Sequence, residues 1–118
     1  MLCDIAATKE PLQFIAAKYD RVLLAARRND MNLDEVRAKI DETDIKIREL
    51  LAMRMELSAD AAAAKARSGK ATLDSSREEA ILNRIRESSP KDTAEYLVSI
   101  YREILRQSRA YQEALRNR

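Results

Sequence analysis

The sequence contains no histidine or tryptophan, and only one glycine, one cysteine and two prolines. Without histidine, the chain has no imidazole to act as a catalytic base or a metal ligand. The single cysteine, Cys3, allows neither a disulfide within the chain nor a cluster of thiolate ligands. One glycine is too few for a glycine-rich phosphate loop, and 4% aromatic residues argues against a β-sandwich or β-barrel. We therefore expect an all-α, metal-free protein whose chemistry uses arginine, lysine, carboxylates, amides and hydroxyls.

Charge is abundant but nearly balanced, because 36% of the residues are charged and the formal net charge is only +2. This excess is too small to indicate nucleic-acid binding, and no helix-turn-helix pattern or interleaved aromatic residues accompany it. No apolar run approaches the length of a membrane span. Acidic residues near the N-terminus and the lack of an apolar leader argue against a targeting peptide. We therefore expect a cytoplasmic protein that has neither nucleic acid nor a membrane as its partner.

Residues 1–31 differ from the rest and are predicted to form an N-terminal extension. Its apolar residues recur at helical spacing, which predicts a short amphipathic helix over about residues 11–28. These residues are Leu12, Ile15, Tyr19, Val22 and Ala26. We expect this extension to pack on the protein or to lie loosely beside it. Residues 32–118 form the predicted main domain, either as a free-standing enzyme or as one domain of a larger protein.

The clearest element is a long helix predicted over residues 33–68, with Asn32 as its N-cap and Gly69 as its stop. A stripe with alternating spacings of four and three runs along it: Val36, Ile40, Thr43, Ile47, Leu50, Arg54, Leu57, Ala61 and Ala64. This heptad-like seam predicts a helix of about 50 Å that packs along its length on another helix. Because so short a chain offers no second helix of that length, we expect a homodimer in which two copies pair.

Two shorter helices are predicted to follow. The first runs over about residues 75–87, and Asp74, Ser75 and Ser76 are candidate N-caps. Its inward residues are predicted to be Ile81, Leu82 and Ile85. The second is predicted over residues 90–116, with Ser89 as N-cap and Pro90 at the first helical position. Its inward stripe is predicted to be Leu97, Tyr101, Ile104, Ser108, Tyr111 and Leu115.

The most informative polar residues interrupt these apolar stripes. A guanidinium at Arg54 must snorkel to water, pair with an internal acid or bind an anion, because burying an unpaired charge is unfavourable. Lys65 lies three helical turns beyond Arg54, on the same face and roughly 16 Å away. Ser108 and Gln112 share one face of the last helix. Together these side chains predict either a polar pocket for a small polyanion or a buried structural hydrogen-bond network.

Arg37 lies seventeen residues before Arg54, which corresponds to roughly 25 Å of helix rise. One straight helix cannot bring both side chains to one small ligand. Arg37 therefore either serves the site of the partner chain or is a solvated surface residue. We expect most arginines of the last helix to form a solvated face: Arg102, Arg106, Arg109, Arg116 and Arg118.

Five segments, each weak alone, together resemble the all-helical (AroQ-type) chorismate mutases in order and spacing. They are 33–41 (LDEVRAKID), 50–57 (LLAMRMEL), 64–65 (AK), 74–78 (DSSRE) and 104–112 (ILRQSRAYQ). The resemblance implies a three-helix protomer in an intertwined homodimer whose long helices pair. It also implies a Claisen rearrangement of chorismate to prephenate, on the way to phenylalanine and tyrosine, without metal or cofactor.

The resemblance further implies how the substrate is held. Arg54 and the partner subunit's Arg37 would bind the two substrate carboxylates, and Ser108 would assist one of them. Lys65 and Gln112 would donate hydrogen bonds to the ether oxygen, where negative charge grows in the transition state. An amide at position 112 donates at any pH, whereas a glutamate there would first have to be protonated.

The acidic end of the site is implied in the same way. Asp74, through its backbone, and Glu78 would meet the ring hydroxyl, while Arg77 would line the pocket and steady this acidic pair. The catalytic residues implied are Lys65, Gln112, Arg54 and Glu78. Two alternatives stay open: an isochorismate-pyruvate lyase of the same fold, and a catalytically silent helical binding or regulatory module. The full polar set favours the mutase.

Overall fold

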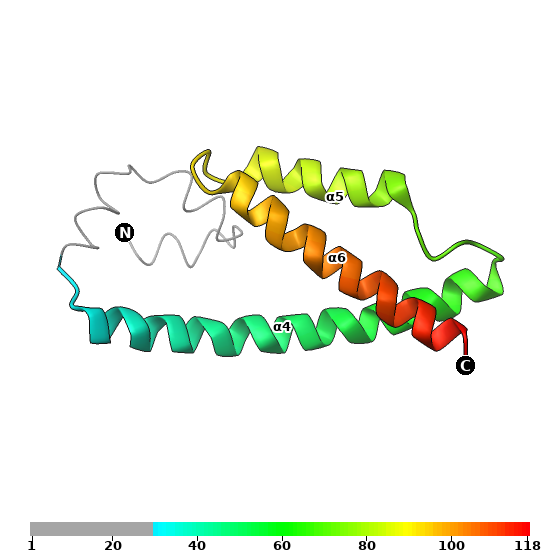
Figure 1. Ribbon diagram of the computed structural model, residues 1–118, viewed down its shortest axis with the longest axis horizontal. Helices are drawn as coiled ribbons and strands as arrows, with labels where there is room; N and C mark the ends of the chain where they lie inside the picture. Colours follow the sequence, from blue (N-terminus) through cyan, green and yellow to red (C-terminus); the bar gives the residue numbers. More distant parts are fainter. Residues whose placement is uncertain (1–29) are drawn as a thin grey trace, which may run out of the picture.

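The computed structural model describes residues 30–118, which form three α-helices and, within that range, contain no strand. The helices are α4 (Leu33–Arg67), α5 (Ser75–Ser88) and α6 (Ala94–Arg116), as Figure 1 shows. The predicted all-α, three-helix protomer is confirmed. The predicted extension, with its amphipathic helix over residues 11–28, lies outside the described residues except for its last two positions.

Helix α4 begins and ends where the sequence predicts. The Asn32 side chain accepts a hydrogen bond from the Glu35 amide at 2.9 Å, which satisfies a free N–H of the first turn. After Arg67 the chain turns at Gly69, whose φ of 68° is strained for residues with a side chain. The Lys70 amide then donates to the Lys65 carbonyl at 2.8 Å and closes the helix end. Among the described helices, none is both long and apolar enough to cross a membrane.

Helix α6 begins four residues later than predicted. The Pro90 carbonyl accepts hydrogen bonds from the amides of Thr93 at 3.1 Å and Ala94 at 2.9 Å. Residues 91–93 therefore form a turn, and Thr93 is the N-cap residue but makes no side-chain cap bond. The fixed φ of Pro90 suits a turn as well as a first helical position, which is why the sequence suggested the earlier start.

The core of the described domain lies on α6, which packs against both α4 and α5 (Figure 1). Its buried residues are Leu82, Val98 and Leu105, and Ile81, Ile85 and Tyr101 pack against them. The inward face of α5 is as predicted. On α6 the predicted stripe is confirmed at Ser108, which is buried, and at Tyr101, which packs against the core. It is wrong at three positions where the next residue is buried instead, namely Val98, Leu105 and Gln112. The physical reason is that α6 packs against both α4 and α5. Its buried face is therefore set by two partner helices, whereas a single apolar stripe suits packing on one.

Within residues 30–118, no other helix covers the N-terminal part of the α4 seam. Of all α4 residues only Ser58 and Ala62 are buried, and both lie toward its C-terminal end. The seam residues Ile40, Ile47, Leu50 and Leu57 are all exposed, Leu50 by 63%. Figure 1 shows the N-terminal half of α4 running apart from α5 and α6. Burying an apolar side chain of this size is worth about 1.5–3 kcal/mol, so this face would gain much from a covering surface.

Candidate active site

A cavity of about 460 Å³ lies between the C-terminal half of α4, the start of α5 and the C-terminal half of α6. This volume is within the usual range of small-molecule sites. Every residue predicted for the site except Arg37 lines this cavity: Arg54, Lys65, Asp74, Arg77, Glu78, Ser108 and Gln112. Arg37 is exposed in the N-terminal half of α4. A single chain therefore brings all the predicted site residues except Arg37 to one cavity.

Arg54 presents a half-buried guanidinium to one wall of the cavity. Its central carbon lies 5.7 Å from the centre of the Tyr101 ring, a cation–π arrangement that contributes about 0.5–1 kcal/mol at such partly exposed positions. No aspartate or glutamate among residues 30–118 forms an ion pair with it, so an internal acidic partner is excluded there. The fork of N–H donors remains available for a carboxylate.

Lys65 is held in place by two hydrogen bonds. Its Nζ donates to the Thr72 carbonyl at 2.6 Å and to Gln112 Oε1 at 2.9 Å. Because an ammonium has three N–H donors, one remains after these two bonds. Thr72 lies in the linker between α4 and α5, and Gln112 lies on α6. The lysine is therefore fixed by two other parts of the chain, which leaves one fixed cationic donor for a ligand.

A continuous chain of hydrogen bonds leads from Lys65 across the cavity floor. Beyond Lys65, Gln112 Nε2 donates to Ser108 Oγ at 3.1 Å, and Ser108 Oγ lies 2.7 Å from Ser58 Oγ. Ser58 Oγ in turn donates to the Arg54 carbonyl at 3.0 Å. Within residues 30–118 no buried side-chain nitrogen or oxygen lacks a partner. The sequence left a polar pocket and a buried hydrogen-bond network as alternatives. In the structure the same side chains line the cavity and form the network.

The direction of each bond in this chain follows from counting protons. Ser58 has one O–H, and it donates to the Arg54 carbonyl, which can only accept. Ser108 must therefore donate its own O–H to Ser58 Oγ. Ser108 has no proton left for a substrate carboxylate while this chain of bonds holds. Gln112, by contrast, keeps one N–H after donating to Ser108. The structure thus favours Ser108 as the residue that orients Gln112.

The acidic end of the cavity is formed at the start of α5. Asp74 is the N-cap residue of α5, and its Oδ1 accepts hydrogen bonds from the Arg77 amide and the Ser76 hydroxyl, both at 3.0 Å. The Arg77 amide foremost, and then the Ser76 hydroxyl, lower the pKa of Asp74 from its ordinary value. Glu78 forms its ion pair with Arg109 of α6. Arg77 lines the cavity as expected, and that it steadies the acidic pair of Asp74 and Glu78 stays a prediction.

The cap predicts a pH-dependent stability. Because the pKa of Asp74 is lowered in the folded state, its ionised form stabilises the fold above the ordinary value of 3.8. That contribution disappears as the pH falls through the lowered native pKa. We therefore expect Asp74→Asn to unfold at a lower temperature than wild type near pH 6, with a difference that becomes smaller as the pH is lowered toward 2. Calorimetry at both pH values measures this, with Asp60→Asn on the exposed face of α4 as the control. An equal deficit at both pH values would contradict it.

Sequence reasoning missed the roles of two arginines beside the cavity. Arg109 and Arg116 were assigned to a solvated face, but both are half-buried and bonded. Arg116 Nη1 donates to Thr72 Oγ1 at 3.1 Å, so it anchors the linker whose carbonyl holds Lys65. Arg109 lies one turn beyond Leu105, which is buried in the core. That spacing indicates that Arg109 lies beside the buried face of α6. The predicted stripe included Ile104 in place of Leu105, so it did not indicate this position.

The fold and the site together define an all-helical bundle with a cation-lined cavity suited to a small anion. The sequence profile of the chorismate mutase type II family matches residues 36–113, which is more than half of the chain. The chain therefore belongs to the chorismate mutase type II family, and the resemblance noted in the sequence is confirmed. The matched range includes every residue predicted for the site. No curated protein sequence and no solved structure matches the chain.

Proposed function

We propose that this protein is a chorismate mutase, which rearranges chorismate to prephenate on the way to phenylalanine and tyrosine. The observation that carries the proposal is that Arg54, Lys65 and Gln112 present donor groups to one cavity. A donor set of this kind suits a small substrate with two carboxylates and an ether oxygen. Membership of the chorismate mutase type II family supports the reaction.

The proposed mechanism needs positioning and charge stabilisation, and no nucleophile. A Claisen rearrangement breaks the C–O ether bond and forms a C–C bond within one molecule, so the protein must hold the substrate in the folded, reactive conformation. Arg54 binds one carboxylate. The free N–H of Lys65 and that of Gln112 donate to the ether oxygen, where negative charge develops. Because both donors are already fixed by the hydrogen-bond chain, little reorganisation accompanies the reaction.

The remaining cavity residues contact the other end of the substrate in this proposal. Glu78 accepts a hydrogen bond from the ring hydroxyl, and the backbone of Asp74 lies beside it on the same wall. The side chain of Arg77 has no ion-pair partner among residues 30–118, so it adds positive charge to the cavity. Ser108 acts by orienting Gln112, which differs from the carboxylate contact implied by the resemblance.

We also propose that the enzyme is a homodimer in which α4 pairs with its copy. The exposed seam of α4 supports this, because Ile40, Ile47 and Leu50 have no covering surface within the described chain. A second copy would place the partner subunit's Arg37 at the site of the first, where it would bind the second carboxylate. The expected location in the cytoplasm stays a prediction from the sequence.

A direct assay tests the proposed function. Purified protein is incubated with chorismate, and the loss of chorismate and the appearance of prephenate are followed by chromatography. The matched control is the Arg54→Ala variant, which lacks the carboxylate fork and whose fold is checked by thermal unfolding. Catalytic formation of prephenate by the wild type alone supports the proposal. A folded wild-type protein that leaves chorismate unchanged would overturn it.

Two further measurements separate the alternatives. Incubation with isochorismate and analysis for salicylate and pyruvate tests a lyase, which shares the pericyclic type of reaction. Binding of an oxabicyclic dicarboxylate that mimics the transition state tests for a catalytic site, because such mimics bind far more tightly than substrates. A catalytically silent binding module would not bind this mimic tightly and would convert neither chorismate nor isochorismate.

Gln112→Glu is expected to make activity depend on pH. When the glutamate is protonated, its single O–H can donate to the ether oxygen in place of the amide N–H, although it then no longer donates to Ser108 Oγ. As the pH rises past the reference value of about 4.3 for glutamate, the carboxylate repels the developing charge. We expect near wild-type turnover at acidic pH and a loss of at least about 100-fold near pH 8, the scale of a missing donor. Turnover measured from about pH 4 to 8 tests this.

The control for this experiment is Gln107→Glu, an exposed position of α6 whose amide bonds to Glu103. It introduces the same charge five residues away on the exposed surface, and its pH profile should follow wild type. A flat profile for Gln112→Glu over the same range would show that the residue does not face the ether oxygen.

A further inference from the structure

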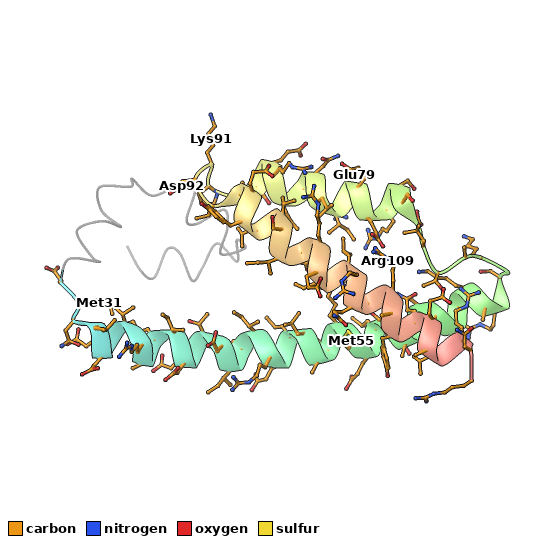
Figure 2. All side chains as sticks on the ribbon, in the orientation of Figure 1. Met31, Met55, Glu79, Lys91, Asp92 and Arg109 are labelled. Carbon is orange, nitrogen blue, oxygen red and sulfur yellow. The ribbon has the colours of Figure 1, made fainter. Side chains whose placement is uncertain are left out.

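An ion pair between Glu78 and Arg109 forms part of the cavity wall and joins α5 to α6. Arg109 Nη1 donates to Glu78 Oε1, and the two side chains are 33% and 21% exposed, for Arg109 and Glu78 respectively. Both residues line the cavity. Figure 2 shows Arg109 on the stretch of α6 between α5 and α4. The pair is therefore less screened by water than an ion pair on the open surface.

The charge balance of the cavity gives this pair a functional meaning. Four cations line the cavity, at Arg54, Lys65, Arg77 and Arg109, against the two carboxylates of Asp74 and Glu78. The excess of positive charge matches a substrate with two carboxylates. Without Arg109, the carboxylate of Glu78 would face that dianion uncompensated, and like charges at close range are repulsive in a partly dry site.

A neighbouring arginine shows that not every arginine of α6 has such a position. Arg106 pairs with Glu103 of its own helix, and both side chains are more than half exposed. Exposed pairs of this kind contribute little to stability or binding. Arg109 differs because its partner lies on another helix and because both members face the cavity.

We propose that Arg109 is a positioning residue of this site, which holds the Glu78 carboxylate as a fixed acceptor for the substrate hydroxyl and neutralises its charge toward the dianion. This inference rests on the proposed function. Arg109 acts through Glu78 and does not itself contact the substrate. Its removal therefore weakens the binding of a dianion, and the effect depends on whether residue 78 is charged.

A double-mutant cycle tests this dependence. The probe is an oxabicyclic dicarboxylate, whose dissociation constant is measured by calorimetry for each variant. We expect Arg109→Gln to weaken binding at least about tenfold, and Arg109→Lys to restore it to within about threefold, because lysine retains the charge. In the Glu78→Gln background, the Arg109→Gln substitution should change binding by less than about threefold.

The controls separate this role from a structural one. Arg106→Gln should bind the probe as wild type does, and thermal unfolding checks the fold of every variant. If Arg109→Gln does not fold, Arg109→Met replaces it in the cycle, because the methionine keeps the packed stem of the side chain. Lysine rescue would be absent if the arginine were needed only for the shape of its guanidinium.

Three results would overturn the inference. If Arg109→Gln binds the probe as tightly as wild type, the pair has no role in binding. If the loss is equally large in the Glu78→Gln background, Arg109 contacts the ligand directly. A folded wild-type protein that neither binds the probe nor converts chorismate would overturn the proposed function, and the role of Arg109 with it.

Discussion

Replacing Lys65 with alanine is expected to lower kcat by roughly 10³-fold or more, with a much smaller change in KM. The physical reason is that the ether oxygen carries little charge in bound chorismate and much more in the transition state. The Lys65 ammonium is fixed by the Thr72 carbonyl and by Gln112, so its remaining N–H acts without reorganisation. A charged donor in a partly dry site is stronger than a neutral one, so Lys65→Ala should reduce kcat more than Gln112→Ala.

Steady-state kinetics with chorismate measures both constants for each variant. The control is Lys91→Ala, an exposed lysine in the turn between α5 and α6 that Figure 2 shows pointing away from the helices. It removes the same charge and should leave both constants unchanged. A higher KM with an unchanged kcat for Lys65→Ala would mean that the lysine binds a ground-state carboxylate and does not act on the ether oxygen.

Local signals in the sequence predict most of the fold. Asn32 and Gly69 mark the ends of α4 because capping depends on residues within a few positions of the helix end. Asp74, one of the predicted caps, fixes the start of α5 in the same way. The start of α6 is harder, because Pro90 suits both a turn and a first helical turn. The outcome depends on where the chain must lie to pack Val98 against Leu82.

For the site as well, the sequence predicts the residues that have a local signal and misses the contacts that depend on tertiary packing. Ser108 and Gln112 are predictable because two polar residues four apart stand out on an amphipathic helix. The pairing of Glu78 with Arg109 is not, since the partners are 31 residues apart and their meeting depends on how α6 packs on α5. The proton count that commits the Ser108 hydroxyl also needs the Ser58 oxygen, which only the folded chain brings near.

The sequence predicts the apolar seam of α4, but the rest of the described chain covers this seam only in part. Its regular spacing predicts a helix–helix contact along its whole length, yet Leu50 and Leu57 are exposed in the described chain. Arg37 shows a similar mismatch between sequence and structure. It is a predicted site residue on α4, but it does not line the cavity that the other predicted residues share. The proposed homodimer would account for both, because a second copy would cover the seam and bring its own Arg37 to the site.

Mixing two inactive variants is therefore expected to restore activity. Arg37→Ala and Arg54→Ala should each fall below about 1% of wild-type activity, because each lacks one carboxylate-binding arginine. In a mixed dimer, one site combines an intact Arg54 from one subunit with an intact Arg37 from the other. Random exchange makes half of the dimers mixed, and each mixed dimer has one intact site, so the mixture should reach about a quarter of wild-type activity.

The matched control is a mixture of Arg54→Ala with Lys65→Ala. Both residues line the same cavity of one chain, so no exchange of subunits can assemble an intact site from these two variants. Exchange is verified in both mixtures by mass spectrometry of subunits with different masses. Recovery with the Arg37 variant, and none with the Lys65 variant, is the result that a shared site requires. Equal behaviour of the two mixtures after complete exchange would show that Arg37 does not act across the dimer, and the exposed seam would then need another partner.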